Sequence, residues 1–363
     1  MNCKSASHSF PAVQGKQAGK EFFIAMCPLK LIPRLFVFNE EEVPPEMRAQ
    51  RTINRARIPA IAEYLVKNPQ TYILSALTAS VGAKVHFKPY CTEMESLGIL
   101  HIPMDAQILI NDGQHRRAAI ETAIKLSPEL ANDNIPVLFF VDEGLGRSQQ
   151  MFADLNQYAV KPDTSLTILY DHRSQEYQLA RYLASECGAF KSLTELEKSK
   201  ISNRSTKLFT LSGIKHANRA LLRKNAKDGF TTAERILAKE FWDAVAEQIP
   251  DWKRARAKEV LTSDLRLNYI HAHGVALHAI GIAGAALLET NPGNWKNVIR
   301  RMRQIDWSRS NSQVWEGRAT LHGRISKATT SIRLTANFLK LNLGLDLTDE
   351  EQTLEEIKRT QGK

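Results

Sequence analysis

Residues 108–123 read ILINDGQHRRAAIETA, and we take this stretch as the one around which the chain is organised. An apolar run ends at Asn111-Asp112-Gly113, and the apolar positions that follow, Ala118, Ala119 and Ala123, recur at helical spacing. The pattern predicts a strand, a tight turn and a helix. The turn brings a carboxylate, an imidazole and two guanidinium groups to a helix N-terminus, where backbone N–H groups and the helix dipole favour an anion. This arrangement suits a phosphate.

The length and composition of the chain favour a soluble protein with two domains. Its 363 residues, 43% of them hydrophobic, can bury one large core or two smaller ones. The four cysteines form no C-x-x-C pair and have no histidine at metal-ligand spacing, so we expect reduced thiols and neither a zinc site nor an iron–sulfur cluster. No signal-peptide pattern opens the chain, and three histidines interrupt its longest uncharged run, residues 267–288. We therefore expect a cytoplasmic protein without a membrane span.

The net charge of +10 is concentrated in the second half of the chain. Residues 1–162 carry 17 Lys and Arg against 16 Asp and Glu, whereas residues 163–363 carry 32 against 23. Residues 191–227 contain ten basic and two acidic residues, and residues 296–333 contain nine and two. With a pI of about 9.4, these two basic blocks predict binding to a polyanion such as double-stranded DNA. A solvated helix face is the alternative interpretation.

The order of patterns predicts an arm followed by two domains, in an α+β or α/β class. Residues 1–20, rich in Ser, Gly, Lys and Gln, are expected to form a flexible arm. Residues 21–162 are expected to form an α/β domain and residues 163–363 a basic helical domain. Strands are predicted at 21–27, 31–38, 72–79, 84–87, 97–102, 107–110 and 135–141. Helices are predicted within 47–67, 114–123, 147–156, 175–186, 214–224, 232–248, 254–288, 294–303, 325–341 and 349–359.

The residues Asp112-Gly113-Gln114-His115-Arg116 admit three interpretations. In the structural one, Asp112 caps the helix, Gly113 supplies an unusual backbone angle, and His115 and Arg116 tie the turn to neighbouring carbonyls. In the binding one, helix amides with Arg116 and Arg117 hold a phosphate of a nucleotide or of DNA. In the catalytic one, Asp112 holds a metal or orients His115, His115 moves a proton, and Arg116 stabilises charge on phosphorus. The sequence favours binding over catalysis.

Further candidates lie on both sides of the motif. Because no Walker pattern occurs, any nucleotide hydrolysis would not be of the P-loop kind, and the dinucleotide-binding pattern G-x-G-x-x-G is also absent. Within and beside the motif, Gly113, Gln114 and Arg117 are candidates for binding a nucleotide or phosphate. Arg51 and Arg57 are candidates for phosphate contacts from across the pocket; the alternative is that they form a solvated helix face. The candidates for contacting DNA are Lys207, Lys215, Arg219, Arg223, Lys224, Arg300, Arg301, Arg303, Arg318 and Arg324. Core positions are favoured for His271, His273, His278, Trp307 and Trp315.

At these residues the sequence resembles the DndB family of DGQHR-domain proteins, which accompany bacterial DNA phosphorothioation. The motif falls on Asp112, Gly113, Gln114, His115 and Arg116 without departure. Other segments that carry the resemblance are 15–19, 48–51 with 57–58, 75–80, 152–156, 323–327 and 343–348. The resemblance implies a ParB/sulfiredoxin-like α/β domain joined to a helical region, in a DNA-binding protein that represses transcription of the modification operon and tunes the extent of modification.

These observations favour a regulator of the phosphorothioation system that binds DNA through its basic helical half and a nucleotide or phosphate at DGQHR. The alternative is an ATP-dependent DNA nickase, or an ATPase acting on DNA, that uses Asp112, His115 and Arg116. A scaffold for other phosphorothioation proteins is a third hypothesis. ATP or another nucleotide, with Mg²⁺, is the ligand to test. The sequence leaves open whether the protein is a homo-oligomer.

Overall fold

The computed structural model describes residues 6–36, 55–141, 150–151, 154–155, 162–225 and 228–361. The chain divides into two compact units, residues 1–160 and residues 161–363, which we call the N-terminal unit and the helical unit. Their secondary structure confirms the α+β class. Two predicted helices lie partly outside the described residues: residues 47–54 of the first one, which include Arg51, and most of the one predicted at 147–156.

A seven-stranded sheet forms the centre of the N-terminal unit, with strand order β4-β5-β1-β2-β7-β3-β6. Its strands are β1 (Ser7–Gln17), β2 (Lys20–Pro28), β3 (Leu77–Val81), β4 (His86–Pro89), β5 (Leu97–Pro103), β6 (Ile108–Asp112) and β7 (Asn134–Val141). Neighbouring strands are antiparallel except for β3 and β7, which are parallel. The sheet is therefore mixed, and β6 delivers its last residue, Asp112, at one edge.

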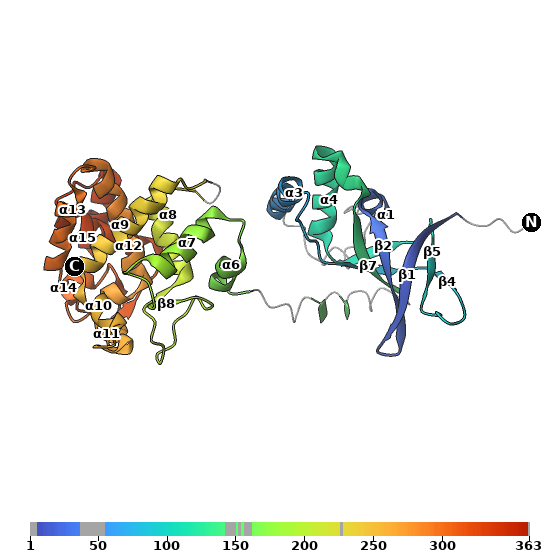
Figure 1. Ribbon diagram of the computed structural model, residues 1–363, viewed down its shortest axis with the longest axis horizontal. Coiled ribbons are helices and arrows are strands. Elements are labelled where there is room, and N and C mark those ends of the chain that lie inside the picture. Colours follow the sequence, from blue (N-terminus) through green and yellow to red (C-terminus); the bar gives the residue numbers. More distant parts are fainter. Residues whose placement is uncertain are drawn as a thin grey trace, which may run out of the picture. The chain divides into compact units, whose positions relative to one another are not determined.

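Helices of the N-terminal unit lie on one side of this sheet (Figure 1). They are α1 (Ile32–Leu35), α3 (Ile58–Lys67) and α4 (Gln114–Leu126), with the short 3-10 helices η1 (Leu29–Leu31), η2 (Arg55–Arg57) and η3 (Pro128–Asn132). Side chains such as Leu65 and Ile120 from the helices share one buried core with Phe23, Val137 and Phe139 from the strands. Burial of these apolar side chains is the main force that fixes α4 on the sheet.

Two predictions for the first forty residues are wrong. Residues 7–17 form β1, paired on both edges with β2 and β5, where a flexible arm was expected. The polar composition hides the strand because only one face is buried: Phe10 and Ala12 point into the core while Val13 is exposed. Residues 31–38 were predicted as a strand, but η1 and α1 occupy residues 29–35, with Pro33 in the first turn of α1; residues 37 and 38 lie outside the described residues.

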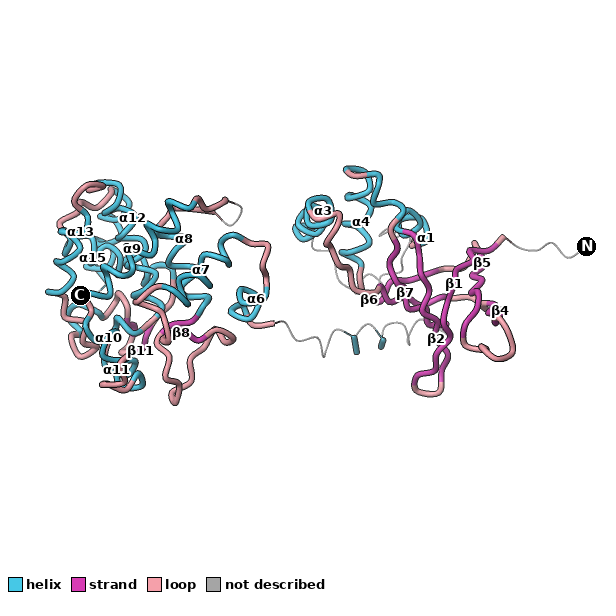
Figure 2. Tube along the Cα trace, viewed as in Figure 1, coloured by secondary structure: helices cyan, strands magenta, loops and turns pink. Residues whose placement is uncertain are grey.

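The helical unit is built mainly from helices, as Figure 2 shows. They are α6 (Thr164–Tyr170), α7 (Gln175–Glu186), α8 (Leu211–Leu221), α9 (Thr232–Gln248), α10 (Pro250–Arg256), α11 (Thr262–Asn268), η4 (Ile270–Ala272), α12 (Gly274–Thr290), α13 (Trp295–Val298), η5 (Ile299–Gln304), α14 (Ser312–Trp315), α15 (Thr329–Leu343) and α16 (Asp349–Gln361). Two-residue strands form two small pairs, β8 (Thr194–Glu195) with β9 (Phe209–Thr210) and β10 (Thr320–Leu321) with β11 (Arg324–Ile325). The apolar helix α12 packs against α8 and α15, so it lies at the centre of the core.

The long helix predicted over residues 254–288 is broken into α10, α11 and α12. The chain leaves α10 through Lys258, whose φ of 61° is left-handed and ends regular helix. Farther on, the N–H of Ile270 donates to the carbonyl of Trp307 at 2.9 Å, a contact with a distant segment. His273 then has an extended backbone and serves as the N-cap of α12. As a result, the 17-residue helix α12 begins at Gly274 and not at residue 254.

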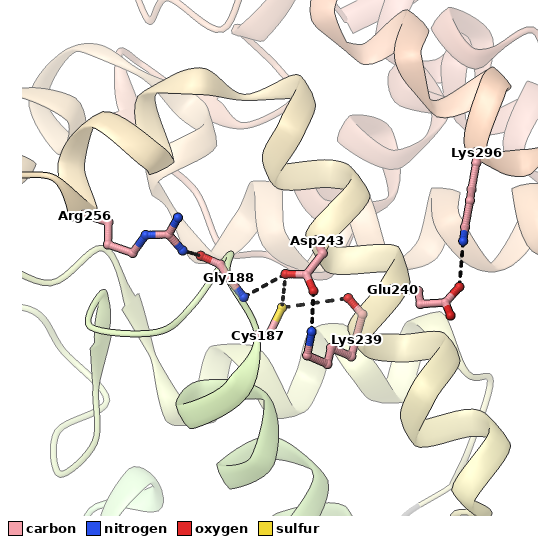
Figure 3. A network of polar contacts seen from close by, with 7 residues as sticks. All are labelled: Cys187, Gly188, Lys239, Glu240, Asp243, Arg256 and Lys296. Atoms are coloured by element: carbon pink, nitrogen blue, oxygen red, sulfur yellow. Dashed lines mark hydrogen bonds and ion pairs between the residues drawn. The ribbon is translucent and has the colours of Figure 1, made fainter.

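A polar network joins the end of α7 to α9 and α10 (Figure 3). Asp243 accepts hydrogen bonds from the N–H of Gly188 at 2.7 Å and the thiol of Cys187 at 3.3 Å, and pairs with Lys239 at 2.7 Å. Arg256 donates to the carbonyl of Gly188. Burial raises the pKa of the Cys187 thiol to about 12, so it stays protonated and unreactive.

No helix among the described residues combines the length and hydrophobicity that crossing a membrane requires.

Candidate functional site

The DGQHR residues form a strand, a one-residue turn and a helix start. Strand β6 ends at Asp112, Gly113 has a φ of 106°, and α4 begins at Gln114. A side chain at Gly113 would overlap the Leu77 side chain, so glycine is needed for space as well as for its backbone angle. This part of the structural interpretation is confirmed. The N-cap residue is Gly113 and no side chain caps the helix, so the expected capping by Asp112 is wrong.

Asp112 is paired with Arg116, one helical turn along α4. The Asp112 Oδ2 atom lies 2.8 Å from an Arg116 guanidinium nitrogen, and Arg116 also donates to the hydroxyl of Ser75. The Arg116 side chain is 18% exposed and that of Asp112 is 51% exposed. A carboxylate that already neutralises the neighbouring guanidinium lowers the net positive charge available to a phosphate at the turn.

Arg117 has a structural role that the sequence did not predict. Its guanidinium donates to the backbone carbonyls of Phe36 at 3.1 Å and Pro33 at 3.0 Å, and pairs with Glu121 at 3.1 Å. These contacts fasten α1 and the residue after it to α4. Three of the five guanidinium N–H donors are used in these contacts, so Arg117 has a structural role in addition to its predicted phosphate contact.

The other candidates around the motif have mixed environments. Gln114 is buried, and its amide donates to the carbonyl of Ile110 at 3.4 Å, whereas His115 is half-buried in the first turn of α4. Arg57 is exposed in η2, directly before α3, which packs on α4. Within the described ranges, no group of three or more His, Cys, Asp or Glu residues has the arrangement of a metal site. At the start of α4 no side chain caps the backbone N–H groups, and the first turn contains no acidic residue, an arrangement that favours an anion in general.

Three of the basic residues predicted to contact DNA are committed to contacts inside the helical unit. Arg219 pairs with Glu176 through two hydrogen bonds of 2.7 Å, and Arg318 pairs with Glu355 through two of 2.6 Å. Lys215 is only 8% exposed, and burial lowers its pKa. The two arginines are neutralised by carboxylates and Lys215 is withdrawn from the surface, so the geometry no longer supports placing them at a DNA interface.

Four more of these residues have surface partners. Arg223 pairs with Glu289 at 2.7 Å and Lys224 with Glu234 at 2.9 Å. Lys207 donates to the carbonyl of Ser192 at 3.0 Å, and Arg301 donates to the carbonyl of Leu343 at 2.7 Å, at the end of α15. The last two keep an uncompensated positive charge, because their acceptors are neutral.

Arg300, Arg303 and Arg324 remain as the clearest candidates for contacting an external phosphate. All three are exposed, and none of their side chains has a hydrogen-bond or ion-pair partner in the part of the chain that the structure describes. Arg300 and Arg303 lie in η5, and Arg324 lies in β11. By contrast, Trp307 and Trp315 stack on each other in the core, with ring centroids 5.4 Å apart, which confirms the core alternative for both.

The sequence missed a set of residues that line a cavity of about 650 Å³ in the helical unit. Its basic members are Lys200, Arg266, Arg309 and Lys327. Three of them come from the two basic blocks, but nothing in the local pattern of either block shows that they meet. The only sequence signal was the His273-Gly274 break within an apolar run, which marks the start of α12.

The comparisons with known proteins identify the family. The family model described as DndB, DNA-sulfur modification-associated, matches residues 10–346. The comparisons with curated proteins and with solved structures gave no match. The match includes the whole sheet from residue 10, the DGQHR turn and all helices of the helical unit except α16. The chain therefore belongs to the DndB family of proteins associated with DNA sulfur modification.

Proposed function

We propose that this protein is a DNA-binding regulator of the DNA sulfur modification system that represses transcription of the modification operon. The observation that carries the proposal is the set of exposed arginines without partners, Arg300, Arg303 and Arg324, in the unit that holds the basic surplus. Unpaired guanidinium groups at a surface bind backbone phosphates and release counterions from DNA. Family membership supplies the biological setting.

The DGQHR turn has a local role in this proposal. It holds one phosphate of a nucleotide at the start of α4, whose first turn contains no acidic residue, although the Asp112 carboxylate just before the turn opposes an anion. Because Asp112 already neutralises Arg116, a triphosphate would need a further cation, and Mg²⁺ bound through Asp112 and phosphate oxygens fits the donor set. In the enzymatic alternative, the same residues cleave ATP and nick DNA.

The DNA-binding proposal is tested by fluorescence anisotropy with the operon's promoter duplex and a scrambled duplex of equal length. The test variant is Arg300→Gln/Arg303→Gln/Arg324→Gln, and the control is Lys16→Gln/Lys84→Gln/Lys88→Gln, which removes the same charge from exposed positions of the N-terminal unit. We expect only the test variant to bind more weakly, with a slope of log affinity against log salt that is shallower by about 0.9 for each phosphate it no longer neutralises. Equal weakening by both variants, or equal wild-type affinity for the two duplexes, contradicts a sequence-specific regulator with this surface.

The enzymatic alternative is tested separately by phosphate release and plasmid relaxation with ATP and Mg²⁺. Turnover by the wild type that is abolished in His115→Ala, with DNA affinity unchanged, would establish the enzyme. No turnover above that of a mock preparation would exclude it and leave the regulator.

A further inference from the structure

The cavity of about 650 Å³ lies wholly within the helical unit. Three stretches of the chain form most of its wall: residues 199–213, residues 263–277, and the pair Arg309 and Lys327. Its lining includes apolar side chains, among them Leu208, Phe209 and Leu277, as well as basic ones. A mixed wall of this kind suits a ligand with an apolar part and charged groups.

The arginines of this cavity are held by neutral groups. Arg266 donates to the carbonyls of Ser202 at 3.1 Å, of Asn203 and Ser205 at 3.0 Å, and of Lys207. Arg309 donates to the carbonyls of Leu267 and Gly323, both at 2.9 Å. A carbonyl satisfies an N–H group without cancelling the charge, so both guanidinium groups keep their full positive charge at the cavity.

Two lysines add to this charge. Lys200 and Lys327 are exposed, and neither has a hydrogen-bond or ion-pair partner within the described residues. The acidic groups nearby are Asp264, which lines the cavity, and Asp163, which accepts hydrogen bonds from the N–H and hydroxyl of Ser199. Four cations against one lining carboxylate leave the cavity positive.

The N-terminus of α12 lines the same cavity. This helix has 17 residues, no side chain caps its N-terminus, and its first residue, Gly274, lines the cavity. A side chain at Gly274 would meet only the Cε atom of Lys327, at 3.9 Å, so the approach to the backbone is open. The helix dipole therefore adds to the potential of the four side chains.

His273, at the wall of the cavity, is a neutral residue. Its Nε2 atom lies 2.7 Å from the carbonyl oxygen of Arg266, which fits a neutral ring that donates from Nε2. Burial lowers the pKa of His273 to about 4; the hydrogen bond to the Arg266 backbone opposes this shift, and the charges of Arg309, Lys327 and Arg266 add to it to a smaller extent. The ring is therefore neutral at pH 7 and does not add to the charge.

We propose that this basic cavity binds the phosphate groups of a ligand, either a mononucleotide or a phosphate of the DNA backbone. The proposal does not rest on the function of the DGQHR turn or on the exposed arginines of η5 and β11. Phosphate is favoured over a carboxylate because the uncompensated cations converge on one space together with a helix N-terminus. The apolar wall beside them gives room for a nucleobase.

The experiment compares the full-length wild type with Lys200→Gln/Lys327→Gln and a control, Lys191→Gln/Lys253→Gln, which changes two exposed lysines outside the cavity lining. Far-UV circular dichroism checks folding. In the first arm, 8-azido-ATP is photocrosslinked and the labelled peptides are mapped. In the second, affinity for a 20-base-pair duplex is measured at several salt concentrations.

Label within residues 199–213 or 263–277 that is absent from the cavity variant and present in the control identifies a mononucleotide ligand. Without such label, an affinity for the duplex about tenfold lower in the cavity variant alone identifies backbone phosphate, and the slope of log affinity against log salt should then be shallower by about 1.8. If the cavity segments take no label and the cavity variant binds the duplex like the control, the proposal is overturned. Label confined to residues 108–126, with duplex affinity unchanged, also overturns it while leaving the DGQHR site intact.

Discussion

Arginines at the DGQHR turn and at the basic cavity are anchored by different partners. Arg116 and Arg117 pair with the carboxylates of Asp112 and Glu121. Arg266 and Arg309 are held by backbone carbonyls instead. Both arrangements fix a guanidinium in place, but only the second leaves its charge available to a ligand. The number of basic residues in a segment therefore says less about anion binding than the identity of their anchors.

The largest effect is expected where a carboxylate anchors a nearly buried arginine. Arg318→Ala leaves Glu355 charged and unpaired at 9% side-chain exposure, and should destabilise the helical unit by about 3–5 kcal/mol. Urea unfolding followed by tryptophan fluorescence measures this, because all five tryptophans lie between residues 242 and 315. Arg223→Ala is the matched control, since its pair with Glu289 is exposed and contributes at most about 1 kcal/mol. A destabilisation by Arg318→Ala no larger than that of the control would contradict a structural role.

The second effect is a pH dependence of the stability of the helical unit that comes from two histidines, His273 and His216. The pKa of His273 is about 4 in the folded protein, below its ordinary value of 6.5, so protons bind the unfolded chain first. Its contribution is fully present above pH 6.5 and is lost as the pH falls toward 4, by about 2 kcal/mol between pH 7 and pH 5. His216, with a pKa also lowered to about 4, contributes in the same direction.

Tryptophan-detected urea unfolding at pH 7 and pH 5 measures the slope for the wild type and for His273→Gln. The variant should lose less stability on acidification than the wild type, whatever its stability at pH 7. An unchanged difference between the two pH values would show that His273 is not held neutral by its surroundings.

Some of this organisation was visible in the sequence, and the reasons are local. The strand, turn and helix at 108–126 could be predicted because an apolar run, a glycine and helical spacing follow one another within sixteen residues. The strand β1 could not, because its burial depends on pairing with β5, some ninety residues away. The anchors of Arg219 and Arg318 are 43 and 37 residues distant, and the cavity draws on residues from 199 to 327. Basic blocks show that charge is present, whereas only the fold decides which charges are cancelled.

A third, smaller effect concerns the turn itself. Gly113→Ala forces a side chain against Leu77 at a φ of 106°, and should destabilise the N-terminal unit by about 1–3 kcal/mol. Gly19→Ala is the control, because that residue also has a positive φ but no neighbouring atom within 4 Å of the added carbon. Hydrogen exchange of β6 and α4 provides the readout. Equal costs for the two variants would show that backbone angle alone explains Gly113.

The smallest effect is expected at the DGQHR turn, when a substitution leaves the charge of Arg116 uncancelled, as the charges of the cavity arginines are. Asp112→Asn removes the carboxylate that neutralises Arg116, so photolabelling of residues 108–126 by 8-azido-ATP without Mg²⁺ should need about fivefold less nucleotide. Asn keeps the size of the side chain, and Glu121→Gln, which removes the carboxylate that pairs with Arg117 on α4, serves as the matched control. Weaker labelling of Asp112→Asn would show instead that the carboxylate itself takes part in binding.

We expect DNA to bind the helical unit through arginines whose charge is not cancelled. Hydrogen–deuterium exchange of the full-length protein, with and without the promoter duplex, tests this claim. We expect the duplex to slow exchange in η5, residues 299–304, and around β10 and β11, residues 320–325, while residues 108–126 exchange as before. Protection confined to residues 108–126, with both arginine-bearing segments unchanged, would contradict the claim.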